Sequence, residues 1–395
     1  MPSERTQRLA ELLPRLREIR HDIHQHPELG FAEERTQALV RRWLTDHGYA
    51  PTVSAKTGLV AELSPSVPRP IALRADLDCL PMQETTPLPY RSVHDGHAHK
   101  CGHDGHTTIL LGVAAMLAAE RETIPSNVRL LFQPSEEGIN GSGGKVMVEE
   151  GALEGVAEVY GLHNWPAYPK GEVRVCPGPI MAQVHNFALT IRGVGGHGSQ
   201  PQLCRDPIVA GAHLVTALQT VVSRGLGYEG GAVVSVGAFL AGDANNVIPE
   251  RAVLKGTIRS FQAAASERVL DRLAEVIAGT ASTFGVTIDS DIRAGYPVLV
   301  NDGDCAAAVA RVAGQVVGAD KVSSVDLPMA GGEDFAYMAE AVPGAYFFLG
   351  AQKPGERTPV CHHPDFDFDD DLIETGVMMM LGLVDDYGRR LSGTS

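Results

Sequence analysis

The chain opens with hydrophobic residues at helical spacing and then changes to short apolar runs. Leucines and isoleucines between Leu9 and Ile23 recur along one helical face, which predicts an amphipathic helix that stops at His26-Pro27. A second helix is predicted from about residue 33 to Gly48. Farther on, runs of strand length alternate with helical stretches: strands are predicted at 60–63, 71–76, 128–133 and 159–162, and helices at 107–119 and 145–150. This alternation predicts an α/β domain in which helices cover a mostly parallel, mixed sheet.

The pattern changes near residue 182, where apolar residues begin to alternate with polar or small ones. Phe187, Leu189 and Ile191 lie on one side of a predicted half-exposed strand. Further strands are predicted at 233–239, 252–259 and 286–292, with helices at 206–224 and 266–284. The earlier pattern then resumes with a helix at 305–317, a strand at 346–349 and a helix from about 372. We therefore predict a larger domain formed by 1–181 and 295–395, with an α+β domain inserted at 182–294.

Composition and charge narrow the classes of function. The 395 residues include 33 basic and 48 acidic side chains, and the resulting charge of −15 disfavours nucleic acid and anionic membranes as partners. No apolar run is long enough for a membrane span. The first residues lack the pattern of a secretion signal, and the six scattered cysteines are typical of reduced thiols, so a cytoplasmic protein is expected.

Acids and imidazoles follow three of the predicted strands. Asp76 ends the strand at 71–76, Glu136-Glu137 follow the strand at 128–133, and His163 follows the strand at 159–162. The carboxyl ends of strands are where α/β proteins present functional side chains. Adjacent side chains on an extended segment point to opposite sides, so one glutamate is predicted to bind and the other to act as a general base. Without the preceding strand, Glu-Glu-Gly would indicate only a solvated turn.

The stretch from His99 to His106 is dense in metal-ligating side chains. It contains one thiol and three imidazoles, and Cys and His bind borderline-soft divalent metals. Five ligands exceed one tetrahedral site, so two ions that share a bridging thiolate or water are predicted. A loop with surface histidines would be the better interpretation of a single histidine, but this density, followed by the distant Glu-Glu and His-His pairs, favours a metal site. The candidate ligands are Cys101, His103, Glu137, His163 and one of His362 or His363.

Two further residues near this stretch have alternative interpretations. Asp76 is predicted to orient an imidazole ligand, and the alternative is a turn or helix-cap aspartate before Pro81. For His106 the sequence leaves two roles open, packing in the core or contact with a ligand.

Six motifs occur in one order along nearly the whole chain. They are Arg74-Ala75-Asp76-Leu77-Asp78-Cys79-Leu80-Pro81, the His99 to His106 stretch, Pro134-Ser135-Glu136-Glu137-Gly138, Gly161-Leu162-His163, Gly195-Gly196-His197 and Gly332-Glu333-Asp334-Phe335. This set resembles the metal-dependent amidohydrolase branch of the aminoacylase/carboxypeptidase family, which includes hippurate hydrolases, N-acyl-amino-acid amidohydrolases and plant auxin-conjugate hydrolases. The resemblance implies a small N-acyl amino acid as substrate. It also implies a metal-binding catalytic domain and an inserted lid domain that forms a homodimer or a higher homo-oligomer.

The resemblance implies roles for the predicted metal ligands. Cys101 resembles a bridging ligand between two divalent ions, which His103 and His163 hold on one side. Glu137 and His362 resemble the ligands of the other ion; His362 is favoured over its neighbour because the family's ligand lies two residues before the proline. Glu136 resembles the general acid/base. Zinc, manganese, cobalt and nickel are all compatible with these ligands.

Residues of the inserted domain resemble a substrate-binding set. His197 resembles a lid histidine that reaches the partner subunit's active site and supports the oxyanion. Asn246 and Arg259 resemble residues that hold the substrate carboxylate, and the alternatives are a turn asparagine and a surface arginine. Gly332 is expected to let the backbone approach the substrate.

One departure and three alternatives qualify the functional prediction. Many relatives carry a histidine after the proline of the lid motif, whereas here Gln202 follows Pro201, which leaves the acyl or side-chain preference open but not the hydrolysis. A peptidase for dipeptides or short peptides would use the same site. An amidase with Cys101 as nucleophile would belong to a different class. A metal-holding module without activity would have no use for Glu136.

Overall fold

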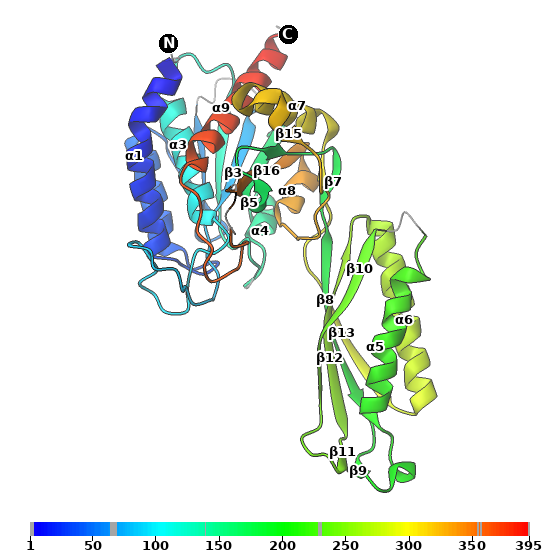
Figure 1. Cartoon of the computed structure of the whole chain (residues 1–395). Helices are drawn as coiled ribbons and strands as arrows, with labels where there is room; N and C mark the ends of the chain where they lie inside the picture. Colours follow the sequence, from blue (N-terminus) through cyan, green and yellow to red (C-terminus); the bar gives the residue numbers. More distant parts are fainter. Residues whose placement is uncertain are drawn as a thin grey trace. The chain divides into compact units, whose positions relative to one another are not determined.

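The computed structural model describes residues 4–63, 69–138, 140–227, 231–353, 355 and 358–393, which form two compact units (Figure 1). The large unit comprises Met1–Gly178, Val300–Leu327 and Asp334–Ser395. The small unit comprises Pro179–Leu299 and Pro328–Glu333. This division includes a short segment, 328–333, that the sequence pattern does not separate from the large domain.

An eight-stranded sheet forms the centre of the large unit. Its strands run in the order β1 (Thr52–Ser54), β2 (Gly58–Leu63), β4 (Val128–Gln133), β3 (Ile71–Asp76), β5 (Glu158–Pro169), β16 (Gly344–Gln352), β6 (Val173–Arg174) and β15 (Val322–Ser323). The four central strands, β4, β3, β5 and β16, are parallel, whereas β2 and β6 pair with them antiparallel. The predicted class, α/β with a mostly parallel mixed sheet, is therefore confirmed. Because β3, β4 and β5 are parallel, their carboxyl ends lie at one edge of the sheet.

Helices cover this sheet (Figure 1). They are α1 (Glu4–Gln25), α2 (Glu34–Asp46), α3 (His103–Ala119), α4 (Gly143–Glu149), α7 (Gly303–Ala313), α8 (Phe335–Ala341) and α9 (Leu372–Ser392), with short helical turns at Gly314–Gly318 and Ala319–Lys321. Residues on every side of α3 are buried, as expected for a helix that is apolar all round. Gly112 allows close packing there: a Cβ atom on it would lie 2.8 Å from Val377 of α9 and 2.9 Å from Leu16 of α1.

The small unit is a four-stranded antiparallel sheet with two helices. The strands run in the order β10 (Ala232–Ala241), β12 (Arg251–Ser260), β8 (Gln183–Arg192) and β13 (Thr287–Ala294). Alternate residues of β8, including Leu189, pack with Leu214 of α5 (Pro207–Ser223) and Leu273 of α6 (Ala263–Phe284). A two-stranded ribbon, β9 (Gly196–His197) with β11 (Val247–Ile248), extends from one end, followed by a turn at Pro201–Leu203. The chain passes between the units at β7 (Gly178–Met181) and β14 (Leu299–Asn301).

The start of α3 differs from the sequence-based expectation. Apolar periodicity predicts a helix from residue 107, whereas the observed helix begins at His103. Gly102 precedes it with φ 108°, a left-handed conformation that favours glycine, and this residue turns the chain into the helix. The first turn is polar but buried, so an apolar pattern could not reveal it. Within the described ranges, no helix is long and apolar enough to cross a lipid bilayer.

Candidate metal centre

Five predicted ligands from separate parts of the large unit form two clusters. Cys101 lies just before α3, His103 begins it, Glu137 follows β4, His163 lies in β5, and His362 lies between β16 and α9. Ligand atoms of Cys101, His103 and His163 lie within 4.8 Å of one another, and so do those of Cys101, Glu137 and His362. The two clusters therefore share the Cys101 sulfur.

Hydrogen bonds at Nδ1 orient the rings of His103 and His163 so that their Nε2 atoms face the cluster with Cys101. His103 Nδ1 lies 2.9 Å from the carbonyl oxygen of Asp78 and 3.2 Å from its carboxylate. His163 Nδ1 lies 2.6 Å from the carbonyl oxygen of Asn164, and its Nε2 is 3.2 Å from Cys101 Sγ. His103 Nε2 is buried and has no hydrogen-bond partner among the described residues. An imidazole whose Nδ1 donates and whose Nε2 is left open is arranged as metal ligands are.

The surrounding charges also favour a cation. Burial alone would lower the pKa of His103, but the Asp76 carboxylate raises it well above its usual value. The pKa of the Cys101 thiol is raised by a hydrogen bond with the Cys361 thiol, then by burial and by the charge of Glu137. A divalent ion would lower the pKa of the Cys101 thiol, because a coordinated thiol is deprotonated. The buried donor set of thiol, imidazole and carboxylate fits such an ion.

The backbone at His362 connects the segments that carry two of the ligands. Its N–H donates to the carbonyl oxygen of Lys100, which precedes Cys101, over 2.6 Å. His362 has φ 68°, which is unusual for a residue other than glycine. Its Nε2 lies 3.2 Å from Glu137 Oε1, so this imidazole, rather than that of His363, faces the cluster.

Asp76 contacts an imidazole that is not among the predicted ligands. Its carboxylate lies 2.7 Å from His106 Nδ1 and accepts a 2.7 Å hydrogen bond from Arg74. Burial would raise the pKa of Asp76, but His103, His106 and Arg74 hold it well below its usual value. The second ring nitrogen of His106 lies 2.6 Å from the Asn164 side chain, so both nitrogens of His106 are engaged.

Asp78 is the functional residue that the sequence reasoning missed. Its carboxylate contacts His103 and also accepts the backbone N–H groups of Glu136 and Glu137, each over 3.0 Å. One side chain therefore positions a predicted ligand and the two glutamates. A signal was present, because residues two apart on an extended segment share a side, so Asp76 and Asp78 were equal candidates.

The two glutamates diverge as expected for adjacent residues. Glu136 is only 6% exposed, and its Oε2 lies 3.8 Å from His103 Nε2. Glu137 extends toward His362 instead. Glu136 therefore lies beside the two clusters that share Cys101 and belongs to neither of them.

In the small unit, His197 and Asn246 lie on the ribbon at one end of the sheet. The carbonyl oxygen of Asn246 accepts the N–H of Gly198, beside His197. His197 Nδ1 accepts the backbone N–H of Ser199 over 3.1 Å. A backbone amide can only donate, so the neutral His197 ring carries its proton on Nε2, where it is available as a donor.

Arg259 and Gly332 lie at the other end of the same sheet. Arg259 donates to the carbonyl oxygen of Ala330 over 2.6 Å, and it faces Val184 across the strands. A Cβ atom on Gly332 would lie 2.7 Å from the Val184 side chain, so the close packing here requires glycine. Arg251 begins β12 at the end where the ribbon lies, and Arg259 is eight residues farther along the strand, a span of about 26 Å at strand geometry. His197 and Asn246 are therefore widely separated from Arg259 and Gly332.

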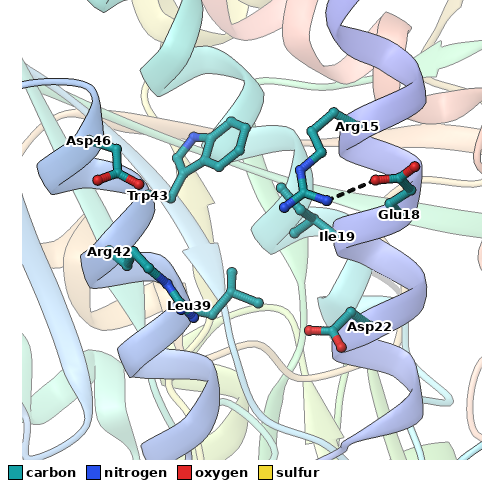
Figure 2. A pocket seen from close by; sticks show the side chains of 8 residues that line it. All are labelled: Arg15, Glu18, Ile19, Asp22, Leu39, Arg42, Trp43 and Asp46. Carbon is teal, nitrogen blue, oxygen red and sulfur yellow. Dashed lines mark hydrogen bonds and ion pairs between the residues drawn. The ribbon is translucent and has the colours of Figure 1, made fainter.

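A hollow of about 500 Å³ between α1 and α2 contains none of the predicted site residues (Figure 2). Its charged groups include Arg15 and Glu18, which form a 2.8 Å ion pair. The lining has neither cysteine nor histidine, so it offers no counterpart to the ligand clusters. It is lined by Arg15, Glu18, Ile19, Asp22, Leu39, Arg42, Trp43 and Asp46.

Comparisons with known proteins find a matching family profile and similar sequences. The profile of peptidase family M20/M25/M40 matches residues 72–386. The N-acetylcysteine deacetylase of Bacillus subtilis is 38% identical over 362 residues, covering 91% of this chain and 93% of the relative. The hippurate hydrolase of Campylobacter jejuni is 35% identical, with coverages of 92% and 94%. The IAA-amino acid hydrolase ILR1-like 4 of Arabidopsis thaliana is 36% identical, with coverages of 93% and 84%.

Two solved structures are similar over almost the whole chain. One is a putative aminohydrolase from methicillin-resistant Staphylococcus aureus, with a TM-score of 0.86, 32% identity and coverages of 97% of this chain and 98% of that chain. The other is the YXEP protein of Bacillus subtilis, described as a dinuclear metal binding peptidase from the M20 family. It has a TM-score of 0.80, 34% identity and coverages of 95% and 98%.

Replacing Asp78 tests its positioning of the cluster. Asp78→Asn removes one of the two carboxylate oxygens that hold His103 and the Glu136-Glu137 backbone, so metal affinity should fall about 10–100-fold. The affinity is measured by competition with a chromogenic chelator. Asp95→Asn, at an exposed position, is the matched control and should bind as the wild type does. Equal affinities in the two variants would contradict this role.

Proposed function

Because the chain belongs to peptidase family M20/M25/M40, we propose that it is a metal-dependent amidohydrolase that cleaves the amide bond of N-acyl amino acids. Three relatives that are at least 35% identical are named as an N-acetylcysteine deacetylase, a hippurate hydrolase and an IAA-amino acid hydrolase. The observation that carries the proposal is the pair of ligand clusters that share Cys101, with Glu136 beside them.

Two divalent ions fit the donor atoms. We assign His103 and His163 to one ion, Glu137 and His362 to the other, and Cys101 to both. The shared sulfur and the buried, open Nε2 of His103 support this assignment. Zinc, manganese, cobalt and nickel all suit thiolate, imidazole and carboxylate ligands. Such a pair of ions polarises a carbonyl oxygen and lowers the pKa of water.

Glu136 is proposed to move the proton. Its carboxylate takes a proton from the attacking water, whose oxygen forms a bond to the carbonyl carbon of the substrate. It then delivers that proton to the leaving nitrogen as the carbon–nitrogen bond breaks, which yields a carboxylic acid and an amino acid. Its burial and its 3.8 Å approach to His103 Nε2 support this role.

The small unit is proposed to bind the substrate carboxylate and to complete the site in a homodimer. Arg259 has the planar donor pattern that suits a carboxylate, and His197 Nε2–H suits a developing oxyanion. One copy cannot bring both to one small substrate, because they lie at opposite ends of the sheet. We therefore propose that the partner copy supplies His197 and Asn246, while Arg259 and Gly332 act within one copy.

Two alternatives use the same residues. A peptidase for short peptides would differ only in the shape of its substrate pocket, and Gln202 leaves the acyl preference open. The 3.2 Å contact between Cys101 Sγ and His163 Nε2 is the observation that favours an amidase with a cysteine nucleophile. Removal of metal separates the cysteine amidase from the two metal-dependent enzymes, and substrate preference separates the peptidase from the amidohydrolase.

A cytoplasmic location is also proposed. All six cysteines lie in the described ranges and are free thiols there. Reduced thiols are the usual state in the cytoplasm.

Replacing Glu136 separates turnover from metal binding. Glu136→Gln retains the size of the side chain but cannot accept the proton, so kcat should fall about 10²–10⁴-fold. Metal content, measured by plasma mass spectrometry, should stay at that of the wild type. Glu34→Gln, at an exposed position, is the control. Full activity in Glu136→Gln would exclude the proposed base.

Metal dependence and substrate class are tested together. Hydrolysis of N-acetyl amino acids, N-benzoyl amino acids and dipeptides is followed by the release of free amine. Chelator should abolish hydrolysis, and zinc, manganese, cobalt or nickel should restore it. Activity that survives full metal removal would favour the cysteine nucleophile, and a preference for dipeptides would favour the peptidase.

Mixing two inactive variants tests the shared site. His197→Ala and Glu136→Gln are each expected to lose activity, but a hybrid dimer would contain one site with both wild-type residues. Random exchange of equal amounts makes half the dimers hybrids, so about a quarter of wild-type activity should return. Activity after mixing is compared with activity before exchange. No recovery in dimers shown by mass spectrometry to be hybrid would place His197 in the same subunit's site or outside it.

A further inference from the structure

The residue directly before Glu136 has an unusual backbone conformation. Ser135 has φ 50°, in the left-handed region that residues other than glycine rarely adopt, and it is fully buried. Backbone conformations of this kind persist only where their surroundings hold them, and they cluster at functional sites. This position sets the direction in which the chain enters Glu136.

Glu33 is one of the groups that hold this turn. Its Oε1 accepts the backbone N–H of Ser135 over 2.9 Å. Its Oε2 accepts the hydroxyl of Thr57 over 2.5 Å, so both carboxylate oxygens are fixed. The Ser135 hydroxyl donates to the carbonyl oxygen of Gly141 over 2.7 Å. Glu33 is fully buried, immediately before α2 and far from β4 in sequence.

Two glycines allow the segments to approach this closely. A Cβ atom on Gly30 would lie 2.4 Å from Ser135 Oγ and 2.9 Å from its Cα. A Cβ atom on Gly58 would lie 2.7 Å from Pro134 Cδ. Separations below 3 Å leave no room for a side chain, so the contact between Glu33 and the turn depends on glycine at both positions.

Glu33 and Asp78 together hold three successive peptide groups. Glu33 accepts the N–H of Ser135, and Asp78 accepts those of Glu136 and Glu137. The pKa of Glu33 is raised to about 7, chiefly by burial and also by the charge of Asp78, against the lowering effect of the Thr57 hydrogen bond. Burying the Glu33 and Asp78 carboxylates near each other lowers the stability of the fold, because like charges repel in the interior. Their presence therefore supports a role in function.

We propose that Glu33 is a positioning residue for the general base: it holds Ser135 in the left-handed conformation that aims the Glu136 carboxylate at the metal centre. The inference rests on the proposed function of Glu136. It concerns proton transfer and not metal binding, because Glu33 contacts the turn and none of the five predicted ligands.

The test uses the full-length, metal-loaded protein and three variants of Glu33. Glu33→Ala and Glu33→Asp withdraw the acceptor from Ser135, so kcat should fall about 10–100-fold while KM changes less than about threefold. Glu33→Gln retains an acceptor oxygen and should keep kcat within about threefold of the wild type. Glu34→Ala, next in the chain and exposed, is the matched control.

Rescue by glycine distinguishes positioning from a general structural role. Glycine adopts positive φ without support, so Ser135→Gly should restore kcat at least about fivefold in the Glu33→Ala or Glu33→Asp background. Metal content and thermal unfolding are measured for each variant. A kcat within twofold of the wild type in Glu33→Ala and Glu33→Asp would overturn the proposal, as would the absence of rescue in folded, metal-loaded protein.

Failure of this inference can be told apart from failure of the proposed function. If Glu136→Gln is inactive but Glu33→Asp and Glu33→Ala are fully active, only the role of Glu33 is rejected. If Glu136→Gln is fully active, the proposed base and the inference about Glu33 both fail. Should Glu33→Ala not fold, Glu33→Asp with and without Ser135→Gly decides the question.

Discussion

The Asp78 carboxylate is the contact on which the candidate site depends. It joins the His103 imidazole to the backbone of Glu136 and Glu137, and so connects the start of α3 to the end of β4. These two segments are adjacent because β3 and β4 run parallel in register, which brings Asp76 opposite Gln133. A buried carboxylate needs hydrogen-bond donors. The donors to Asp78 are the His103 imidazole and the backbone N–H groups of Glu136 and Glu137, which are the groups that the site needs in fixed positions. The same hydrogen bonds therefore satisfy a buried charge and orient the predicted chemistry.

Several strands could be predicted because β3 and β4 are short apolar runs with polar ends. The strand predicted at 159–162 instead continues as β5 past His163 to Pro169. The predicted spans 71–76 and 128–133 coincide with β3 and β4, whereas the inserted domain at 182–294 stays a prediction. The start of α3 was missed because its first turn is buried through polar contacts, in which His103 and His106 meet carboxylates. Hydrophobic periodicity does not register burial of that kind.

The candidate ligands could be listed from residue type and motif order, but the residues that support them could not. Asp76 and Asp78 are both acids on one side of an extended segment, and only the fold shows that the Asp78 carboxylate contacts His103 Nδ1 while the Asp76 carboxylate contacts His106 Nδ1. Glu33 is about a hundred residues from Ser135 in sequence, so no local pattern relates them. The left-handed backbone of Ser135 is equally hidden, because serine carries no conformational signature of positive φ.

The surroundings of Cys101 bear on whether it serves as a ligand or a nucleophile. A nucleophilic cysteine needs a lowered pKa, usually from a nearby positive charge or a helix amino terminus. Although Cys101 lies just before the amino terminus of α3, the pKa of its thiol is raised by the Cys361 hydrogen bond, by burial and by the charges of Glu137 and Glu136. The pKa of its neighbour His163 is lowered by burial and by His106, so an imidazolium to stabilise the thiolate is disfavoured. A divalent cation is the partner that would make this sulfur a thiolate, which favours the metal-dependent amidohydrolase over the cysteine amidase.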